Sequence, residues 1–233
     1  RSNFMHNQAG EGNPAGEGGG AYIETGYVDI MDSHFSANIG GKSGGGLCVK
    51  YSKCSFMRTV FEGNRNDGNK FGGEGLSILG AYGYGPTLLT NLTFLNHIQP
   101  SPALYGGSLK TWNGGPYLVK GCVFRDNLNK DGGAIYAYGT NGYVISDSTF
   151  VGNTGKRAGA VHFLNEKNQA MPNNIITRCN FSNNVVDGPG GAIYTDFNLL
   201  SMVNTTFSSN SASGRAATAQ GGAIFGTETS VID

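Results

Sequence analysis

The chain repeats two apolar positions, and each lies in a fixed pattern of polar and small residues. The first position is a phenylalanine, and around Phe150 it is preceded by Tyr, Val, Ile, Ser and Thr, which suit a pleated, half-buried strand. Eight phenylalanines occupy it: Phe4, Phe35, Phe61, Phe94, Phe124, Phe150, Phe181 and Phe207. Asparagine follows three residues later in seven copies, at Asn7, Asn38, Asn64, Asn127, Asn153, Asn184 and Asn210, whereas His97 follows Phe94.

The second position is an apolar residue, usually branched, that follows a glycine pair. Its copies are Gly19-Gly20-Ala21-Tyr22, Gly44-Gly45-Gly46-Leu47, Gly73-Glu74-Gly75-Leu76, Gly106-Gly107-Ser108-Leu109, Gly132-Gly133-Ala134-Ile135, Ala158-Gly159-Ala160-Val161, Gly190-Gly191-Ala192-Ile193 and Gly221-Gly222-Ala223-Ile224. The phenylalanines recur every 29 residues on average. A period of about 20 to 50 residues is typical of solenoids, propellers and arrays.

This pattern predicts an all-β fold, a single-stranded right-handed parallel β-helix (β-solenoid) of about eight coils. Helical spacing is absent, and 39 glycines would destabilise helices. Glycine pairs are expected to supply corners with positive φ, and stacked coils should place Phe over Phe and Asn over Asn. A WD40 propeller, a leucine-rich repeat and a Ca²⁺-binding nonapeptide solenoid each need a signature that this chain lacks.

Residues 1–233 are expected to form one β-solenoid domain. The repeats begin and end in mid-pattern, and no polar capping repeat is visible. We therefore expect an internal segment of a longer protein, or an uncapped filament protomer. Its expected partners are neighbouring repeats or copies of itself, paired through open strand edges.

The charge balance argues against a nucleic-acid partner. Lys plus Arg and Asp plus Glu both number 16, so the basic surface that nucleic-acid binding requires is not expected. No run of 18 apolar residues occurs, so no membrane insertion of this segment is expected.

The four cysteines fall into two pairs. Cys122 and Cys179 both precede a repeat phenylalanine by two residues, which predicts buried, free thiols two coils apart and never bonded to each other. Cys48 and Cys54 flank a segment that must turn a corner, and they form a candidate disulfide whose presence the sequence leaves open.

The alternating G-G-A-[ILV] and F-x-x-N motifs resemble the repeats of the polymorphic outer membrane protein family, whose passenger domains are secreted surface β-helices. The clearest copies run from Gly132 to Ile135, from Gly190 to Ile193 and from Gly221 to Ile224, together with the four phenylalanine motifs from Phe124 onward. The resemblance is strong after Gly106 and looser before it. It implies an extracellular location at a cell surface and a role in adhesion.

No catalytic, cofactor-binding or metal site is predicted. Glycoside hydrolysis needs two carboxylates about 5 to 10 Å apart, and the acidic residues fall in different columns or coils. The four histidines occupy four different repeat positions. The oxygen-rich segment 64–74 lacks the spacing of a Ca²⁺ loop and is interpreted as a polar turn.

Three N-glycosylation sequons occur, at Asn91, Asn180 and Asn204. Counted back from the phenylalanine, all three asparagines are expected to point outward. They are candidate glycan sites if the protein is secreted from a eukaryotic cell.

One surface row is a candidate contact site. The residue after the branched apolar position is Tyr136, His162, Tyr194 and Phe225 in the last four coils, which predicts an outward row of rings. An edge loop or another subunit would cover such a row, or it would contact a partner protein or a sugar. Longer connections at 96–105, 164–174 and 211–220 are expected as surface loops.

The sequence therefore favours a non-enzymatic, extracellular structural or adhesive β-helix. The alternatives are a carbohydrate-active β-helix, acting as a polysaccharide hydrolase or lyase, and a lectin-like module that uses the ring row. Carboxylates gathered in an open groove would favour the enzyme.

Overall fold

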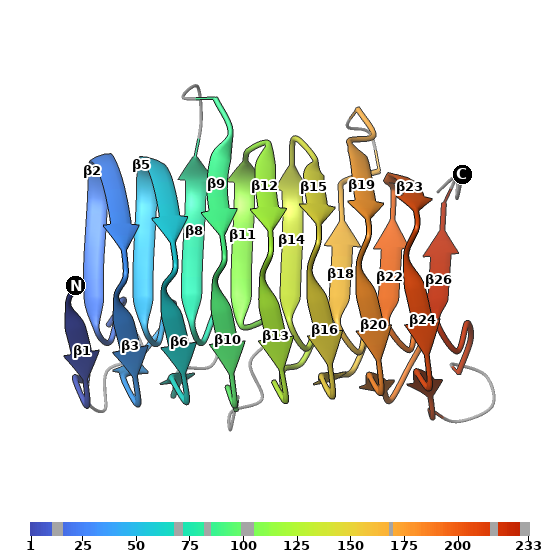
Figure 1. Ribbon diagram of the computed structural model, residues 1–233, viewed down its shortest axis with the longest axis horizontal. Helices are drawn as coiled ribbons and strands as arrows, with labels where there is room; N and C mark the ends of the chain where they lie inside the picture. The colour runs from blue at the N-terminus through green and yellow to red at the C-terminus, as the bar shows by residue number, and fades with distance from the viewer. Residues whose placement is uncertain are drawn as a thin grey trace.

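The computed structural model describes residues 1–10, 16–67, 72–81, 85–98, 105–167, 170–214 and 219–228. These residues form a parallel β-helix of about seven turns, whose axis runs horizontally in Figure 1. Every strand pairing within the described ranges is parallel. The predicted fold class is confirmed, and the prediction of about eight coils corresponds to the eight strands of the first sheet.

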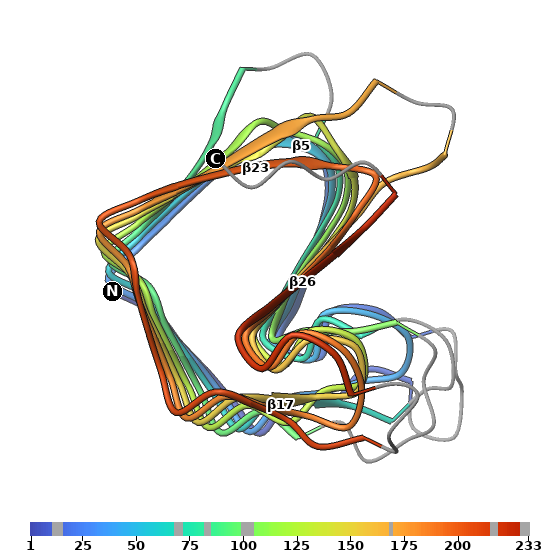
Figure 2. The ribbon, with the colours of Figure 1, turned by 90° about the vertical axis from the view of Figure 1, so that its right-hand side faces the viewer.

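The chain winds in the right-handed sense. In Figure 2 the C-terminal end faces the reader, and the chain advances toward the reader while running counterclockwise. A right-handed crossover is what twisted parallel strands favour.

The first sheet contains the phenylalanine column and forms the near face in Figure 1. Its strands, in spatial order, are β1 (Asn3–Met5), β3 (His34–Ser36), β6 (Val60–Glu62), β10 (Thr93–Leu95), β13 (Val123–Arg125), β16 (Thr149–Val151), β20 (Asn180–Ser182) and β24 (Thr206–Ser208). The eight phenylalanines lie in register, and consecutive ring centroids are 4.5 to 5.1 Å apart with nearly parallel planes. The predicted Phe stack is confirmed.

The second sheet bends around a corner and supplies two sides of the coil, which we call the roof and the wall. The roof contains β9 (Thr87–Thr90), β12 (Tyr117–Lys120), β15 (Tyr143–Ser146), β19 (Asn173–Thr177) and β23 (Leu199–Val203). The wall contains β8 (Leu76–Ala81), β11 (Leu109–Gly114), β14 (Ile135–Thr140), β18 (Val161–Leu164), β22 (Ile193–Asp196) and β26 (Ile224–Thr227). Two long strands, β2 (Ala21–Met31) and β5 (Leu47–Met57), cover both sides and bend at Thr25 and Tyr51, where φ is 58° and 48°.

Short strands close the coil at its base. β4 (Ile39–Gly40) pairs with β7 (Arg65–Asn66), and β17 (Thr154–Gly155), β21 (Val185–Val186) and β25 (Ser211–Ala212) pair in that order. After the base, the chain returns to the foot of the wall through the connections visible at the lower right of Figure 2.

The repeated asparagines form the predicted ladder at the corner between the first sheet and the base. The Oδ1 atom of Asn153 accepts hydrogen bonds from the backbone N–H and the Nδ2 group of Asn127, at 3.3 and 2.9 Å. Its own Nδ2 group donates to the carbonyl of Phe124 at 3.0 Å. At His97 the ladder loses its side-chain link, although the His97 backbone N–H still donates to Asn127 Oδ1 at 3.2 Å.

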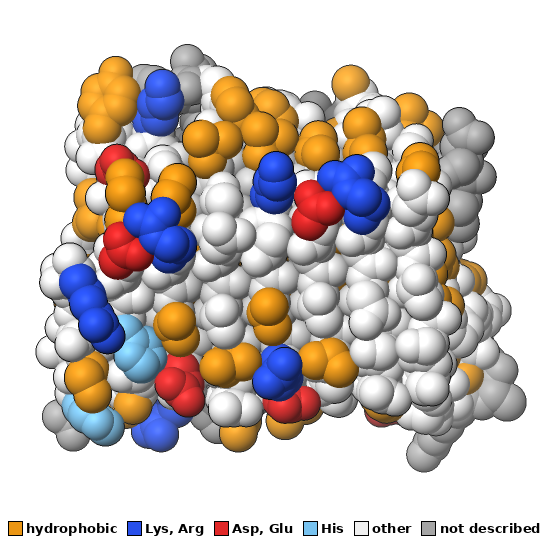
Figure 3. Space-filling view, viewed as in Figure 1, with side chains coloured by type: hydrophobic (Ala, Val, Ile, Leu, Met, Phe, Trp, Pro, Cys, Tyr) orange, Lys and Arg blue, Asp and Glu red, His pale blue; other side chains and the backbone are white. Residues whose placement is uncertain are grey.

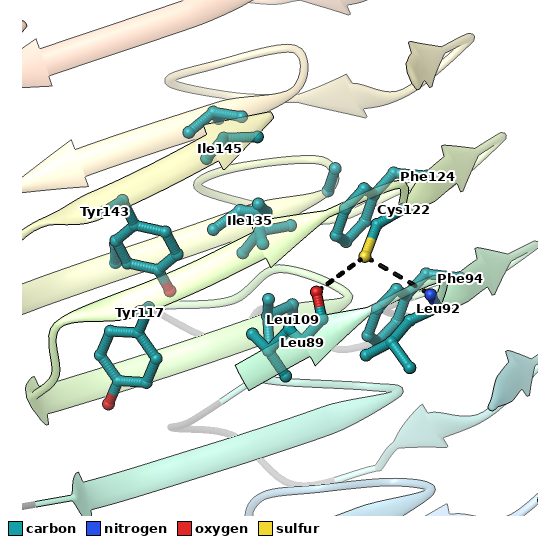
Figure 4. Close-up of a cluster of buried hydrophobic side chains, with 14 of the residues drawn as sticks. Leu89, Leu92, Phe94, Leu109, Tyr117, Cys122, Phe124, Ile135, Tyr143 and Ile145 are labelled. Carbon is teal, nitrogen blue, oxygen red and sulfur yellow. Dashed lines mark hydrogen bonds between the residues drawn. The ribbon is translucent and has the colours of Figure 1, made fainter. Parts of the chain in front are cut away.

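The tube interior is mainly apolar, with a few hydrogen-bonded polar groups such as Thr111 and the Tyr143 hydroxyl, 2.6 Å apart. Figure 4 shows one part of it. Leu89, Leu109, Ile135 and Ile145 are buried beside the phenylalanine stack, and all belong to one continuous cluster. Cys122 lies in the same cluster, where its Sγ contacts Leu89 O at 3.3 Å and accepts a 3.4 Å hydrogen bond from the Leu92 N–H.

The glycine pairs have a second role besides the one predicted. The first glycine has positive φ in some copies, for example 67° at Gly44 and 75° at Gly190. The second glycine lies against the backbone of the next coil, and a Cβ on Gly133 would be 2.1 Å from Gly159 O. Close packing of backbones therefore excludes side chains there.

The first glycine motif is shifted by one residue relative to the sequence prediction. The strand register pairs Ala21, and not Tyr22, with Leu47, so the predicted alignment of this copy was wrong by one residue.

The cysteine predictions have different outcomes. Cys122 and Cys179 are buried and free, which confirms the prediction. Cys48 and Cys54 are also free, so the candidate disulfide is not formed. Both lie in β5, separated by about 20 Å of extended chain that bends at Tyr51, and a disulfide needs Cα atoms within about 7 Å. Of these two, Cys54 belongs to the tube cluster and Cys48 does not.

Candidate functional site

The outer face of the wall is covered over its lower part by the connections that return from the base (Figure 2). We call the layer between this face and those connections the side lobe. Its composition differs from that of the tube because polar side chains fill it. The buried polar groups of the side lobe include Ser43, Asn66, Glu74, Ser77, Ser108, Lys110, Asn129, Asp131 and His162.

The predicted ring row lies in this lobe. Tyr136, His162, Tyr194 and Phe225 pair in register, with ring centroids 5.4, 4.8 and 5.6 Å apart, so a contiguous row is confirmed. The row faces away from the tube, as predicted, and of the alternatives left open, cover by a loop is the one that the structure bears out. Tyr136 and His162 are fully buried and the other two are partly buried, so the interpretation as an exposed contact site is wrong. Tyr105, from a returning connection, lies 5.9 Å from the Tyr136 ring. The row is mostly interior and offers little surface to a sugar or partner.

Two ionisable side chains of opposite sign are fully buried in the lobe. Burial raises the pKa of the Glu74 carboxyl to about 8, and its own backbone N–H and the charge of Lys110 offset only part of this effect. Burial lowers the pKa of the Lys110 ammonium to about 7, against the opposing charges of Cys48 and Glu74. Perturbed groups of this kind are enriched at functional sites, although structural networks also perturb them.

Asp131 is the second buried carboxylate of the lobe. Burial raises its pKa to about 6, and the Arg157 guanidinium, 3.5 Å away, opposes that shift. Burial also lowers the pKa of His162 to about 3 and that of His97 to about 4. Both imidazoles are therefore neutral at physiological pH. The His97 Nδ1 atom lies 2.6 Å from the carbonyl oxygen of Leu95.

A cleft of about 520 Å³ opens where the side lobe meets the upper wall. One side is the outer face of β5, β8 and β11, and the other is the returning segments that carry Glu17, Lys42 and Ser43. The lining residues are Glu17, Lys42, Ser43, Lys50, Tyr51, Leu79, Gly80, Lys110, Trp112 and Asn113.

The charged groups of the cleft are fixed by contacts across coils. Glu17 pairs with Lys42 at 3.3 Å and also with Lys50. The Lys50 ammonium lies 5.5 Å from the centroid of the Tyr22 ring, whose hydroxyl donates to Glu24 at 2.7 Å. These contacts hold the Lys50 side chain in place beside the cleft.

An aromatic group borders the same cleft. The Trp112 ring lies 4.3 Å from Tyr138 and 6.2 Å from Tyr105, and the Lys110 ammonium is 5.2 Å from its centroid. Tyr138 is held in turn by a 2.7 Å hydrogen bond that its hydroxyl donates to Glu166. The cleft therefore combines a supported aromatic ring with the ammonium groups of Lys42 and Lys50, while the Lys110 ammonium is buried beside it.

The acidic side chains do not converge in this cleft. Among the described residues, Glu17 is the single acidic residue that lines it, whereas Glu74 is fully buried behind it. A pair of carboxylates facing a substrate is what glycoside hydrolysis needs. Within the described ranges, no three His, Cys, Asp or Glu side chains are grouped to hold a metal ion. Four residues of the polar segment 64–74, positions 68–71, lie outside the described residues.

The sequon asparagines lie on the opposite side of the molecule from the side lobe. Asn91, Asn180 and Asn204 are exposed, which confirms their predicted outward direction. Asn91 and Asn204 occupy left-handed corners with φ of 53° and 51°. Figure 3 shows this face as mainly backbone and uncharged polar side chains, with hydrophobic and charged groups scattered over it. The longer connections predicted as loops include residues 99–104, 168–169 and 215–218, which lie outside the described residues.

Sequence reasoning missed Glu74, Lys110 and Trp112 as site residues. A signal existed for two of them. Every other repeat has glycine at the second position of the glycine pair, where Glu74 stands. Lys110 pairs with Tyr136 of the next coil and so belongs to the same column as the ring row. Extending the ring row toward the N-terminus would have reached Lys110. Trp112 carried no repeat signal, because only the returning connections make its position part of a cleft.

Comparison with known families places two coils in a described repeat type. Residues 178–196 and 204–227 match the Chlamydia polymorphic membrane protein repeat. The matched segments contain Phe181 with Asn184 and Phe207 with Asn210, together with their glycine motifs, so the resemblance seen in the sequence is confirmed there. No curated protein and no solved structure gives a significant match. The described residues contain no helix with the length and hydropathy of a membrane span.

Proposed function

We propose that this chain, which carries repeats of the Chlamydia polymorphic membrane protein type, is a segment of an extracellular, cell-surface β-helix with a structural and adhesive role and no catalytic one. The match of two coils to that repeat carries the proposal. The in-register phenylalanine and asparagine columns extend the same architecture across the other coils. A stack of coils that each contact only their neighbours makes a long, stiff support for surface display.

The distribution of acidic groups supports the non-catalytic part of the proposal. Among the described residues, the cleft beside Trp112 has one acidic lining residue, Glu17, and that carboxylate is engaged by Lys42 and Lys50. Glycoside hydrolysis needs a pair of carboxylates that face the substrate, and a single carboxylate engaged by two lysines does not supply that pair.

Surface display and adhesion can be tested separately. Antibodies raised against the folded chain should label intact cells of the source organism without permeabilisation. Beads coated with the chain should adhere to cultured cells, and soluble chain should compete with them. A double variant, Phe124→Ala with Phe150→Ala, provides an unfolded control. Labelling that requires permeabilised cells, or beads that adhere no better than beads with the unfolded control, would contradict the proposal.

A lectin-like function is the second candidate, and the cleft beside Trp112 favours it. The separate enzymatic alternative, a polysaccharide hydrolase or lyase, predicts that incubation with polysaccharides releases new reducing ends or unsaturated products. The surface proposal predicts neither product. End-to-end association with neighbouring repeats or with copies of the chain stays a prediction, which sedimentation velocity over a range of concentrations tests.

A further inference from the structure

The asparagine ladder is interrupted between the coil of Phe61 and the coil of Phe94. At most junctions, ladder asparagines of neighbouring coils are joined through their side chains. His97 replaces the asparagine here, its Nδ1 atom lies 2.6 Å from the Leu95 carbonyl oxygen, and its buried Nε2 atom has no hydrogen-bond partner. The backbone N–H of Asn64 therefore finds no side-chain acceptor in the next coil.

The base sheet is interrupted at the same junction. Elsewhere the residue after the ladder position donates its backbone N–H to the ladder residue of the preceding coil, as Thr154 does to the Asn127 carbonyl at 2.8 Å. The corresponding bond, from the Ile98 N–H to the Asn64 carbonyl, is absent among the described residues. Within the same described ranges, β7 pairs only with β4, and Ile98 bridges only to Leu128.

A cleft of about 410 Å³ opens on the base side of this junction. Residues of both coils line it, and they are Gly63, Arg65, Asp67, Asn96 and Ile98. The interrupted ladder, the interrupted sheet and the cleft thus coincide. On this side, space separates the two coils where backbone hydrogen bonds join other coils.

The other sides of the junction are paired as elsewhere in the stack. The Phe61 and Phe94 rings stack with centroids 5.0 Å apart, and β6 pairs with β10 in register. Strand β5 pairs with β8 in the wall and with β9 in the roof. Opening the base side therefore breaks few hydrogen bonds, while the remaining sides keep the two coils joined.

We propose that this junction is a hinge that opens on its base side, so that the β-helix moves as two stiff blocks joined at the Phe61 and Phe94 coils. Local opening occurs where the fewest contacts oppose it. A solenoid with equal contacts between all coils has no preferred place to bend. The hinge goes beyond the surface role proposed above, because it gives the support a bend at one fixed position.

Gly63 reports on this opening, and Gly152 is its matched control. The Gly63 N–H donates across the junction to the Leu95 carbonyl at 3.0 Å, at the corner beside the cleft. The Gly152 N–H makes the equivalent bond to the Ser182 carbonyl at 3.1 Å, and φ is 56° at Gly63 and 65° at Gly152. The junction that Gly152 spans has an intact ladder and an intact base sheet.

Amide hydrogen exchange of the unmodified chain, followed by NMR, tests the hinge directly. After correction for the exchange rates of an unstructured chain, Gly63 should exchange at least about tenfold faster than Gly152. The two amides share residue type, corner conformation and bond length. A difference of this size therefore reflects how often each junction opens.

The variant His97→Asn restores the missing side chain of the ladder. Asparagine fits at this place, because Gly75 lies over His97 as Gly46 lies over Asn64. The variant should slow exchange at Gly63 at least about fivefold and leave Gly152 unchanged. His97→Ala removes the imidazole without restoring the ladder, so Gly63 should exchange at least as fast in it as in the unmodified chain.

Three results would overturn the proposal. They are equal protection of Gly63 and Gly152 in the unmodified chain, unchanged protection of Gly63 in a folded His97→Asn variant, and equal slowing at Gly63 by His97→Asn and His97→Ala. Circular dichroism of each variant establishes that the fold is retained. The comparison of the two glycines in the unmodified chain decides the question even where a variant does not fold.

Discussion

The wall strands bury both of their faces, but they do so in different ways. Facing the tube, Leu109, Ile135 and Val161 occupy one column and are similar in size and polarity. One residue later, on the opposite face, the column reads Lys110, Tyr136 and His162. Both columns are fully buried, so burial alone does not make a column uniform.

The difference comes from what covers each face. A residue inside the tube contacts equivalent residues in the coils before and after it, and uneven sizes would leave gaps in a close-packed interior. The outer face is covered by connections that differ in length and sequence from coil to coil (Figure 2). Each outer residue therefore has its own surroundings, and the side lobe can hold a local site that the tube cannot.

The tube should be the most sensitive region to truncation. Phe150 stacks on Phe124 at 4.9 Å and on Phe181 at 4.5 Å, so Phe150→Ala removes contacts on both sides. We expect the free energy of unfolding to fall by about 3 to 5 kcal/mol in urea titrations followed by circular dichroism. Phe207→Ala, at a partly buried ring, should cost clearly less. Equal losses would mean that the stack is not the continuous core described.

A side chain at the second glycine of the glycine pair should destabilise the fold wherever this glycine packs against the backbone of the next coil. A Cβ at Gly133 would lie 2.1 Å from Gly159 O, and backbone cannot move away cheaply. Gly133→Ala should lower the free energy of unfolding by about 1 to 3 kcal/mol. Gly222→Ala is the matched control in the same column, where the nearest atom is Asn210 O at 3.9 Å. A similar loss at both positions would rule out close backbone packing as the cause.

The side lobe should reveal itself through pH. The pKa of Glu74 is about 8 in the folded chain and 4.5 as its ordinary value, so the folded state holds the proton longer. Its contribution to stability is full below pH 4.5 and is lost as pH rises through 8. Relative to Glu74→Gln, the unmodified chain should therefore lose up to about 1.4 kcal/mol of unfolding free energy per pH unit as pH rises from 4.5 to 8.

Lys110→Met is the opposite case. The pKa of Lys110 falls from 10.5 to about 7 on folding, so its contribution to stability is lost as pH falls through 7. Relative to this variant, the unmodified chain should become more stable as pH rises from 7 to 10.5. Stability curves that stay parallel for both variants would show that neither group is buried as described.

The smallest effects are expected at the exposed corners. Arg178 forms two hydrogen bonds to the Asp147 carboxylate, at 2.6 and 3.0 Å, and both side chains face solvent. Water and salt screen such a pair. Arg178→Ala should leave the urea midpoint unchanged within error at 0.5 M salt, as should Arg58→Ala at the equivalent pair with Asp32. A clear loss at high salt would indicate a packing role.

The tube was largely predictable from the sequence, and the side lobe was not. Phe124 and Asn127 recur at fixed spacing because each coil imposes the same geometry on the next, so their columns could be aligned without coordinates. His162 was correctly placed in a row with Tyr136, but its burial depends on returning connections that share no common pattern. Contacts between residues with unrelated repeat positions leave no periodic signal.

The parallel, in-register stacking of coils is the central claim, and one cross-linking experiment tests it directly. Thr149 and Asn180 are paired residues on neighbouring strands, whereas Ser182 pairs with Val151. The four native cysteines are buried and free, and burial raises the pKa of the Cys122 thiol to about 12, so they should react slowly. With the short fluorogenic cross-linker dibromobimane, the double variant Thr149→Cys with Asn180→Cys should become fluorescent rapidly, and Thr149→Cys with Ser182→Cys should lag far behind. Equal rates, or faster reaction of the second pair, would contradict the register on which the whole structure depends.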